Sequence, residues 1–202
     1  MTTLFFDIGS TLVDERKAYD HHARLMLEGS GVPFSDFDRK RRELYLSGKD
    51  GNSGAAAFFH LREKPWPSED ESVFPDAFDT LEYLKDRGYR LGIVANQPEG
   101  TVRRLDSYGL LPFFSVIVPS YESGFRKPDE RIFLKALNEA GCRRDEAWMI
   151  GDRLDNDIAA AHRLGMKTVW IRSALWSLTP VSFSDGIADL RINKLSELKL
   201  HF

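Results

Sequence analysis

The feature that most constrains the fold is a regular alternation of short apolar runs with amphipathic helical segments. The runs are rich in β-branched residues, which is typical of strands covered on both faces. They are residues 4–6, 91–95, 116–118, 148–150 and 168–171, with a further strand expected at 189–192. Helical windows lie at 75–87, 128–140, 156–164 and 196–200. This order predicts the α/β fold class, with a Rossmann-like parallel sheet that carries helices on both faces.

Residues 15–78 interrupt the alternation, because they contain no convincing strand. Helices are expected near 16–28, 35–46 and 54–61, and residues 65–71 read as a solvent-exposed return linker. We therefore predict a small all-helical cap domain, residues 15–78, over the carboxyl edge of the sheet. The core domain would then consist of residues 1–14 and 79–202.

Composition excludes several classes of protein. A length of 202 residues suits one domain with a sizeable insertion. The net charge of −3 gives no pull toward polyanions, so no nucleic-acid partner is expected. The single cysteine, Cys142, fits a reducing compartment. Asp7 interrupts the N-terminal apolar run, and no stretch is long enough for a membrane span. We expect a cytoplasmic protein without a membrane partner, either a monomer or a homodimer.

Polar residues follow the expected strands at the points where each strand ends. Asp7 follows the first strand, Asn96 follows the second, and residues 151–157 (Gly-Asp-Arg-Leu-Asp-Asn-Asp) follow the fourth, while Lys127 precedes a helix. The carboxyl ends of parallel strands meet at one edge of a sheet, where ligands bind. Carboxylates gathered there suit Mg²⁺, and a lysine beside such an ion suits a phosphoryl group.

These motifs resemble those of the haloacid dehalogenase-like hydrolases, in the subgroup with a helical cap inserted after the first motif. The family's first motif, Asp-x-Asp-x-Thr/Val, stands here as residues 7–11 (Asp-Ile-Gly-Ser-Thr). Its lysine matches Lys127, and its fourth motif, Gly-Asp-x-x-x-Asn-Asp, matches residues 151–157 at every defined position. The resemblance covers essentially the whole chain in order and spacing.

The resemblance implies a role for each matching residue. Asp7 would attack phosphorus and form an aspartyl-phosphate that water hydrolyses, while Lys127 screens the charge repulsion. Ser10, Thr11 and Asn96 are expected at the substrate. The metal ligands are expected to be Asp7, the backbone carbonyl of Gly9, Asp152 and, in the outer shell or bonded to Lys127, Asp157.

Two positions depart from the family pattern. Gly9 stands where phosphatases of the family carry a second aspartate, the general acid, and acid–base catalysis contributes about 10²–10⁴-fold to rate. Ala95 stands where a serine or threonine hydrogen-bonds the phosphate, and Asn96 is a possible replacement donor. The replacements considered for the missing acid are the histidines of the cap: His21, His22 and His60.

The leading functional hypothesis is a magnesium-dependent phosphomonoesterase acting on a small phosphorylated metabolite, slowed by the loss of the second aspartate. Two alternatives stay open at this point. One is a catalytically degenerate relative that binds a phosphorylated ligand or a partner without turnover. The other is an enzyme with a different chemistry, which cleaves either carbon–phosphorus bonds, with Lys49 as the candidate Schiff-base lysine, or carbon–halogen bonds.

Overall fold

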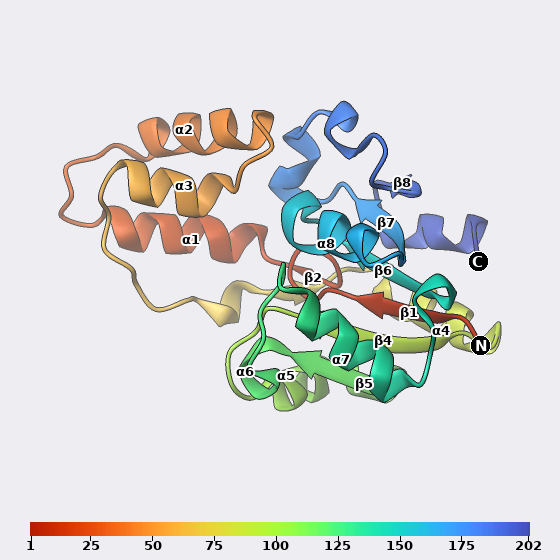
Figure 1. Cartoon of the computed structure of the whole chain (residues 1–202). Coiled ribbons are helices and arrows are strands. Elements are labelled where there is room, and N and C mark those ends of the chain that lie inside the picture. Colours follow the sequence, from red (N-terminus) through yellow and green to blue (C-terminus); the bar gives the residue numbers. More distant parts are fainter.

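A computed structural model describes the backbone of residues 1–202 and all side chains except those of residues 174 and 175. Its central sheet has six parallel strands in the order β5-β4-β1-β6-β7-β8 (Figure 1). They are β1 (Thr3–Phe6), β4 (Arg90–Ala95), β5 (Val116–Pro119), β6 (Ala147–Gly151), β7 (Lys167–Ile171) and β8 (Leu190–Ile192). The predicted parallel sheet is confirmed, including its weakest strand at the C-terminal edge.

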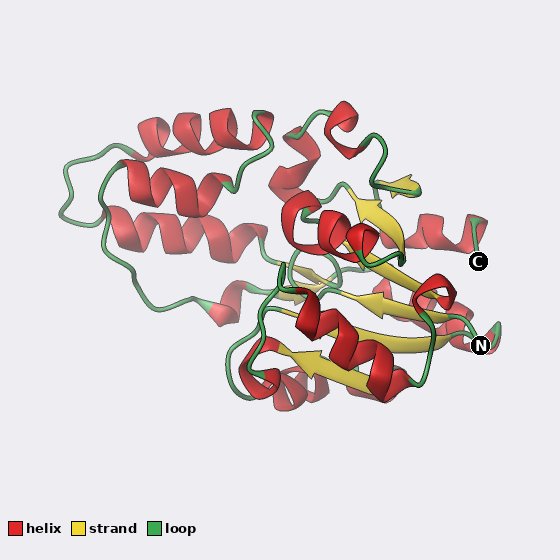
Figure 2. Ribbon diagram, in the orientation of Figure 1, coloured by secondary structure: helices red, strands yellow, loops and turns green.

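Helices cover both faces of the sheet (Figure 2). Helices α4 (Ala77–Asp86) and α5 (Thr101–Ser107), together with the 3₁₀ helix η7 (Leu195–Leu200), share one hydrophobic cluster. Helices α7 (Glu130–Ala140) and α8 (Ala159–Arg163) share the other. Side chains of β1 alternate between the clusters: Leu4 and Phe6 enter the first, and Phe5 enters the second. This alternation explains why every residue of the strand is apolar or buried.

The remaining short helices lie in the connections. They are η1 (Ser68–Asp70), η2 (Leu111–Phe113), α6 (Ser120–Ser123), η3 (Arg144–Glu146), η4 (Leu154–Ile158), η5 (Ala174–Leu178) and η6 (Val181–Ser184). The helix expected at 156–164 begins two residues early, in the π-helical turn η4, and continues as α8. The short helix expected at the C-terminus is η7, which is of the 3₁₀ type.

Three helices form a separate layer beyond the strand ends. Figure 1 shows α1 (Arg16–Leu27), α2 (Phe34–Leu46) and α3 (Gly51–Phe58) side by side, on the side toward which the sheet strands point. They share a hydrophobic cluster of their own, built around Met26, Phe37 and Ala55. Helix α3 begins three residues before the expected position, because Asp50 caps it by accepting a hydrogen bond from the Ser53 N–H.

One expectation for residues 15–78 was wrong. They contain the strand β3 (Ser72–Val73), which pairs antiparallel with β2 (Val13–Asp14). A two-residue strand has no periodicity to detect, and it forms only because the two chain segments that connect the sheet to the helical layer lie side by side. The linker was also expected to be exposed, yet the Glu71 side chain is fully buried. The predicted domain boundaries themselves stay predictions.

No helix in the described part of the chain is long and apolar enough to cross a bilayer. The cytoplasmic location, the absence of a nucleic-acid partner and the choice between monomer and homodimer stay predictions.

Candidate active site

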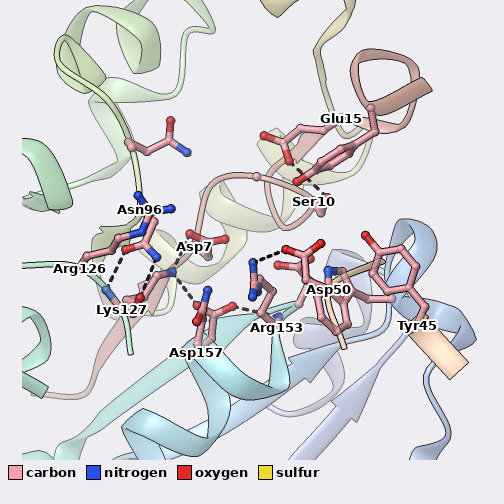
Figure 3. Close-up of a pocket in the computed structure, with 16 residues that line it drawn as sticks. Asp7, Ser10, Glu15, Tyr45, Asp50, Asn96, Arg126, Lys127, Arg153 and Asp157 are labelled. Carbon is pink, nitrogen blue, oxygen red and sulfur yellow. Dashed lines mark hydrogen bonds and ion pairs between the residues drawn. The ribbon is translucent and has the colours of Figure 1, made fainter. Parts of the chain in front are cut away.

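A polar cavity of about 160 Å³ lies beyond the carboxyl ends of the strands, between the sheet and the helical layer (Figure 3). Its walls come from the loops after β1, β4 and β6, the loop before α7, and the segments around α1, α2 and η5. The residues that line it are Asp7, Gly9, Ser10, Glu15, Tyr19, Tyr45, Asp50, Asn96, Gln97, Arg126, Lys127, Asp152, Arg153, Asn156, Asp157 and Trp176. The site therefore lies at the sheet edge expected from the sequence.

The loop before α7 is held in place by Asn96, the residue that follows β4. The Asn96 side chain accepts a hydrogen bond from the Lys127 backbone N–H at 2.8 Å and donates one to the Lys127 backbone carbonyl at 2.9 Å. This pair of bonds joins two loops that are 31 residues apart in the sequence. Asn96 lines the cavity, but its amide is already engaged in positioning Lys127.

The buried ammonium group of Lys127 bridges two carboxylates. Its Nζ lies 2.7 Å from Asp7 Oδ1 and 2.6 Å from Asp157 Oδ1. Burial acts to lower the pKa of Lys127, but the attraction of Asp157 and Asp7 outweighs it and raises that pKa. Lys127 therefore stays a cation at neutral pH, as the charge-screening role expected from the sequence requires.

Asp157 reaches Lys127 because the strand end beside it is a glycine. A Cβ on Gly151 would overlap the Asp157 carboxyl group. The carboxylate also accepts a hydrogen bond from the Arg153 backbone N–H, 3.0 Å from Oδ2. Burial raises the pKa of Asp157 to about 6, although Lys127 acts in the opposite direction.

Asp152 is buried next to these groups. Its backbone carbonyl accepts a hydrogen bond from Trp170 Nε1 at 2.8 Å, and the Thr11 hydroxyl lies 3.5 Å from its Oδ1. Burial and the negative charges of Asp157 and Asp7 raise the pKa of Asp152 well above its usual value. A cation bound nearby would favour the ionised form of this carboxyl group and lower its pKa.

The three acidic side chains fit a divalent metal ion. Asp7, Asp152 and Asp157 each offer one carboxylate oxygen, and these oxygens all lie within 4.8 Å of one another. The described residues supply one buried lysine against this charge, and burial followed by the surplus of negative charge raises the pKa of Asp152. Carboxylate oxygens are the donors that hard divalent cations prefer, so the residues present fit such an ion.

The two hydroxyl residues after β1 differ in position. Ser10 lines the cavity, with its backbone in the left-handed region at a φ of 53°. Thr11 is fully buried, lies outside the described set of lining residues, and directs its hydroxyl to Asp152. The contact places Thr11 beside Asp152, and its expected role at the substrate stays a prediction.

Sequence reasoning missed Glu15, a carboxyl group in the wall of the cavity. Burial, followed by the negative charges of Asp7 and Glu71, raises the pKa of Glu15 to about 8. Nothing in the sequence marks it, because an acidic residue directly before a helix is an ordinary helix start. The candidates considered instead lie elsewhere: none of His21, His22, His60 and Lys49 is among the described lining residues.

The helical layer also closes one side of the cavity through direct contacts. Asp50, at the start of α3, accepts a hydrogen bond from Arg153 Nη1 at 2.9 Å. The Tyr45 ring at the end of α2 meets the Trp176 ring edge-on, with centroids 4.9 Å apart. Thr179 donates a hydrogen bond to the Tyr45 carbonyl at 2.9 Å. The loop of residues 151–157 (the motif loop) and the segment of residues 176–179 thus both hold the helical layer over the site.

Comparisons with known proteins agree with this geometry. A model of the haloacid dehalogenase-like hydrolase family matches residues 1–165. A glyceraldehyde 3-phosphate phosphatase of Pyrococcus furiosus is 30% identical over 227 aligned positions, which cover 96% of this chain and 90% of that protein. The enzyme of the same name from Methanopyrus kandleri is 36% identical over 62% of this chain, and this match spans only 54% of that protein.

A solved structure extends the likeness to the fold. The crystal structure of a haloacid dehalogenase-like phosphatase from Thermococcus onnurineus superimposes with a TM-score of 0.67 and 27% identity, covering 100% of this chain and 97% of that one. The family model, the parallel sheet and the placement of the motif residues agree. The chain therefore belongs to the haloacid dehalogenase-like hydrolases.

Proposed function

We propose that this protein is a magnesium-dependent phosphomonoesterase that hydrolyses a small phosphorylated metabolite through an aspartyl-phosphate on Asp7. The observation that carries the proposal is the bridge of Lys127 between Asp7 and Asp157, with Asp152 in the same cluster. The names of the relatives from Pyrococcus and Methanopyrus support the class of reaction.

Asp7 is the nucleophile in this proposal. Its carboxylate oxygen attacks phosphorus, the bond from phosphorus to the substrate oxygen breaks, and water later cleaves the aspartyl-phosphate. Lys127 holds the Asp7 carboxylate in one orientation and reduces its repulsion with the phosphate dianion. Asn96 sets the position of Lys127 through its two backbone bonds, and Ser10 lies at the cavity wall beside the phosphate.

Asp7, Asp152 and the Gly9 carbonyl are the proposed ligands of Mg²⁺, and Asp157 holds Lys127 beside them. When bound, the ion neutralises charge on the phosphoryl oxygens. Ala95 at the end of β4 has no hydroxyl to donate to the phosphoryl group. Lys127 and the backbone N–H groups of the first motif therefore contribute more of the phosphate binding.

The cavity favours a small substrate. A volume of about 160 Å³, enclosed on one side by Tyr45, Asp50 and Trp176, leaves room for a phosphate and a few further atoms. Both signs of charge line it, since Arg126 and Arg153 join the acidic cluster in its wall. In this proposal α1–α3 act as a cap that excludes bulk water during turnover.

The test is magnesium-dependent release of phosphate from 4-nitrophenyl phosphate, with Asp7→Asn beside the wild type. An aryl phosphate has a good leaving group and needs little help from a general acid. We expect turnover that is lost with EDTA, restored by Mg²⁺, and reduced by several orders of magnitude in Asp7→Asn. Asp155→Asn is the matched control, because Asp155 lies in the same loop but is half exposed and bonds only to Arg153 among the described residues.

Two results would contradict the proposal. Binding of Mg²⁺ without turnover of any phosphate ester would favour the degenerate, ligand-binding alternative. Cleavage of a phosphonate with loss of activity on borohydride reduction would favour the carbon–phosphorus alternative, although Lys49 lies outside the described lining of the cavity.

A further inference from the structure

The carboxyl group of Glu15 occupies the space that a side chain at position 9 would fill. A Cβ built on Gly9 would lie 2.5 Å from both Glu15 Oε1 and Oε2, and 2.8 Å from Glu15 Cδ. Real Cβ atoms essentially never come so close to another heavy atom. A glycine at position 9 and a glutamate at position 15 are therefore spatially complementary. The first motif has no second carboxylate of its own, but the carboxyl group of Glu15 lies where that carboxylate would be.

Glu15 is held in this position from two directions. Ser10 Oγ donates a hydrogen bond to Oε2 at 3.4 Å, and Arg104 Nη2 lies 3.8 Å from Oε1. Arg104 is itself anchored by the fully buried Glu71 side chain, at 2.5 Å. The Glu15 side chain is only 10% exposed, and it lines the cavity that also contains Asp7. Figure 3 shows Glu15 beside Ser10, across the cavity from Lys127.

The lysine and the other carboxylates in the wall are already engaged in other contacts. Asp7 is the nucleophile, Lys127 is a cation held by two carboxylates, and Asp152 and Asp157 belong to the acidic cluster. The remaining carboxylates among the described lining residues are Asp50 and Glu15. Asp50 accepts hydrogen bonds from Arg153 and from the start of α3, so it is engaged as an acceptor.

We propose that Glu15 is the general acid and base of this enzyme and replaces the aspartate that the first motif lacks. This inference rests on the proposed function. In the first step the Asp7 oxygen bonds to phosphorus, the bond from phosphorus to the substrate oxygen breaks, and the Glu15 carboxyl proton passes to that oxygen. In the second step Glu15 accepts a proton from water as the water oxygen bonds to phosphorus. The Asp7 oxygen–phosphorus bond breaks, which releases phosphate and regenerates Asp7.

The acid would come from the segment that leads to the cap. Glu15 directly precedes α1 and follows β2, whose pairing with β3 joins the two connections between sheet and helices. Its placement therefore depends on the same segment that sets the position of the helical layer. A mobile cap would carry the acid with it, which couples proton transfer to closure of the site.

The first experiment compares leaving groups in Glu15→Gln, saturated with Mg²⁺. For glycerol phosphate, whose leaving group needs a proton, we expect kcat to fall about 10²–10⁴-fold. For 4-nitrophenyl phosphate we expect a burst of about one nitrophenolate per enzyme, then slow turnover, because the first step needs no acid but the second needs the base. Asp14→Asn is the matched control: it removes a neighbouring carboxylate that bonds to Arg16, and the ratio of the two activities should not change.

The second experiment moves the carboxylate back to position 9. Gly9→Asp alone should not raise activity above wild type, because the new side chain displaces the Glu15 carboxyl group and so exchanges one carboxylate for another. Glu15→Ala alone should lose the glycerol phosphatase activity. The double variant Gly9→Asp/Glu15→Ala should exceed Glu15→Ala in that activity by at least about tenfold, since the carboxylate returns to the same space. A residue with a purely structural role would give no such rescue.

The outcomes separate this inference from the proposed function. Wild-type turnover that is lost in Asp7→Asn, combined with unchanged glycerol phosphatase activity in Glu15→Gln and no rescue at position 9, overturns the role of Glu15 alone. Absence of turnover in the wild type overturns the proposed function, and the role of Glu15 falls with it. Circular dichroism and Mg²⁺ titration of each variant, compared with wild type, identify a loss of activity that comes from misfolding.

Discussion

At the scale of single residues, the site holds several buried carboxyl groups close together, and only some of them have a cationic partner nearby. Lys127 satisfies Asp7 and Asp157. Among the described residues, Asp152 forms no ion pair, and Glu15 has only Arg104 at 3.8 Å. Burial raises the pKa values of Glu15 and Asp152, and this imbalance of charge raises them further. From the sequence, an aspartate at position 9 would be expected to improve the enzyme. In the structure the Glu15 carboxyl group already occupies that space, so an aspartate there would have to displace it.

Lys127→Met should strongly destabilise the metal-free protein, since it leaves Asp7 and Asp157 buried without their cation. Breaking a buried ion pair by removing one partner costs about 3–5 kcal/mol. Urea unfolding at neutral pH measures this free energy. The matched control is Lys135→Met, whose partner Glu139 forms an exposed pair on α7 and whose loss should cost less than about 1 kcal/mol. Equal effects of the two substitutions would contradict the account of the site.

Glu15 should make the unfolding free energy of the metal-free protein fall as pH rises. Its pKa is about 8 in the folded chain against 4.5 for an ordinary glutamate, so in this interval the unfolded state loses the proton that the folded state keeps. Stability present below pH 4.5 is therefore lost progressively up to about pH 8, at no more than about 1.4 kcal/mol per pH unit. Urea unfolding in EDTA should show a flatter pH dependence in Glu15→Gln than in the wild type.

The control for this measurement is Asp14→Asn. Its hydrogen bond to Arg16 lowers the pKa of Asp14, so its contribution to stability is lost only on acidification below about pH 4. Between pH 5 and 8 this substitution should shift the curve by a constant amount of about 0–1 kcal/mol. An identical slope in wild type and Glu15→Gln would show that Glu15 is ionised in the folded protein at neutral pH.

At the scale of elements, the helical layer is attached to the sheet at a few defined contacts. The β2–β3 pair holds the two connecting segments together, and Arg104 on α5 binds the buried Glu71 of the return segment. Trp66 adds a hydrogen bond to Glu71 at 2.6 Å. On the opposite side of the cavity, Arg153 of the motif loop binds Asp50 of α3. The first group fixes the connection. The Arg153–Asp50 contact closes over the site together with the contacts of Tyr45 with Trp176 and Thr179.

Asp50→Asn should therefore weaken closure without disturbing α3, because asparagine is as good a helix cap as aspartate. Loss of a partly exposed ion pair is worth about 0.4–1 kcal/mol, so KM for a small phosphate ester should rise about two- to fivefold with little change in kcat. Asp155→Asn is the control, since it removes the other partner of Arg153 without crossing to the helical layer. A fall in kcat at constant KM would contradict a role in closure.

At the scale of the whole molecule, the described residues form four hydrophobic clusters, one of which (Leu154, Ile158 and Trp170) lies directly beside the loop that carries Asp152 and Asp157. Of the other three, two lie on the two faces of the sheet and one lies within α1–α3. The acidic cluster belongs to none of them and sits where they meet, at the strand ends. Its negative charge is a cost to the fold, so binding of a cation there would be linked to folding.

Mg²⁺ should accordingly stabilise the protein against urea. At a concentration about one hundred times the Kd, the expected gain in the free energy of unfolding is about 2.7 kcal/mol. The gain should disappear in Asp152→Asn and persist in Asp155→Asn, which changes a carboxylate outside the cluster. The same gain in both variants would place the metal elsewhere.

Much of this protein is predictable from its sequence because the relevant signals are local. Apolar runs mark the strands, the motif residues follow them, and parallel strands must bring their carboxyl ends to one edge. That reasoning alone is enough to gather Asp7, Lys127, Asp152 and Asp157 at one site, where the tertiary structure also places them.

Only the tertiary structure shows which residues come into contact when no sequence pattern connects them. The Glu15 carboxyl group fills the space at Gly9 because the chain turns back after β1, and a sequence read in a line shows only a missing aspartate. Likewise, Glu71 is buried and β3 exists because two distant segments run side by side. Periodicity and spacing report on neighbours along the chain, whereas burial and side-chain packing depend on which segments meet in space.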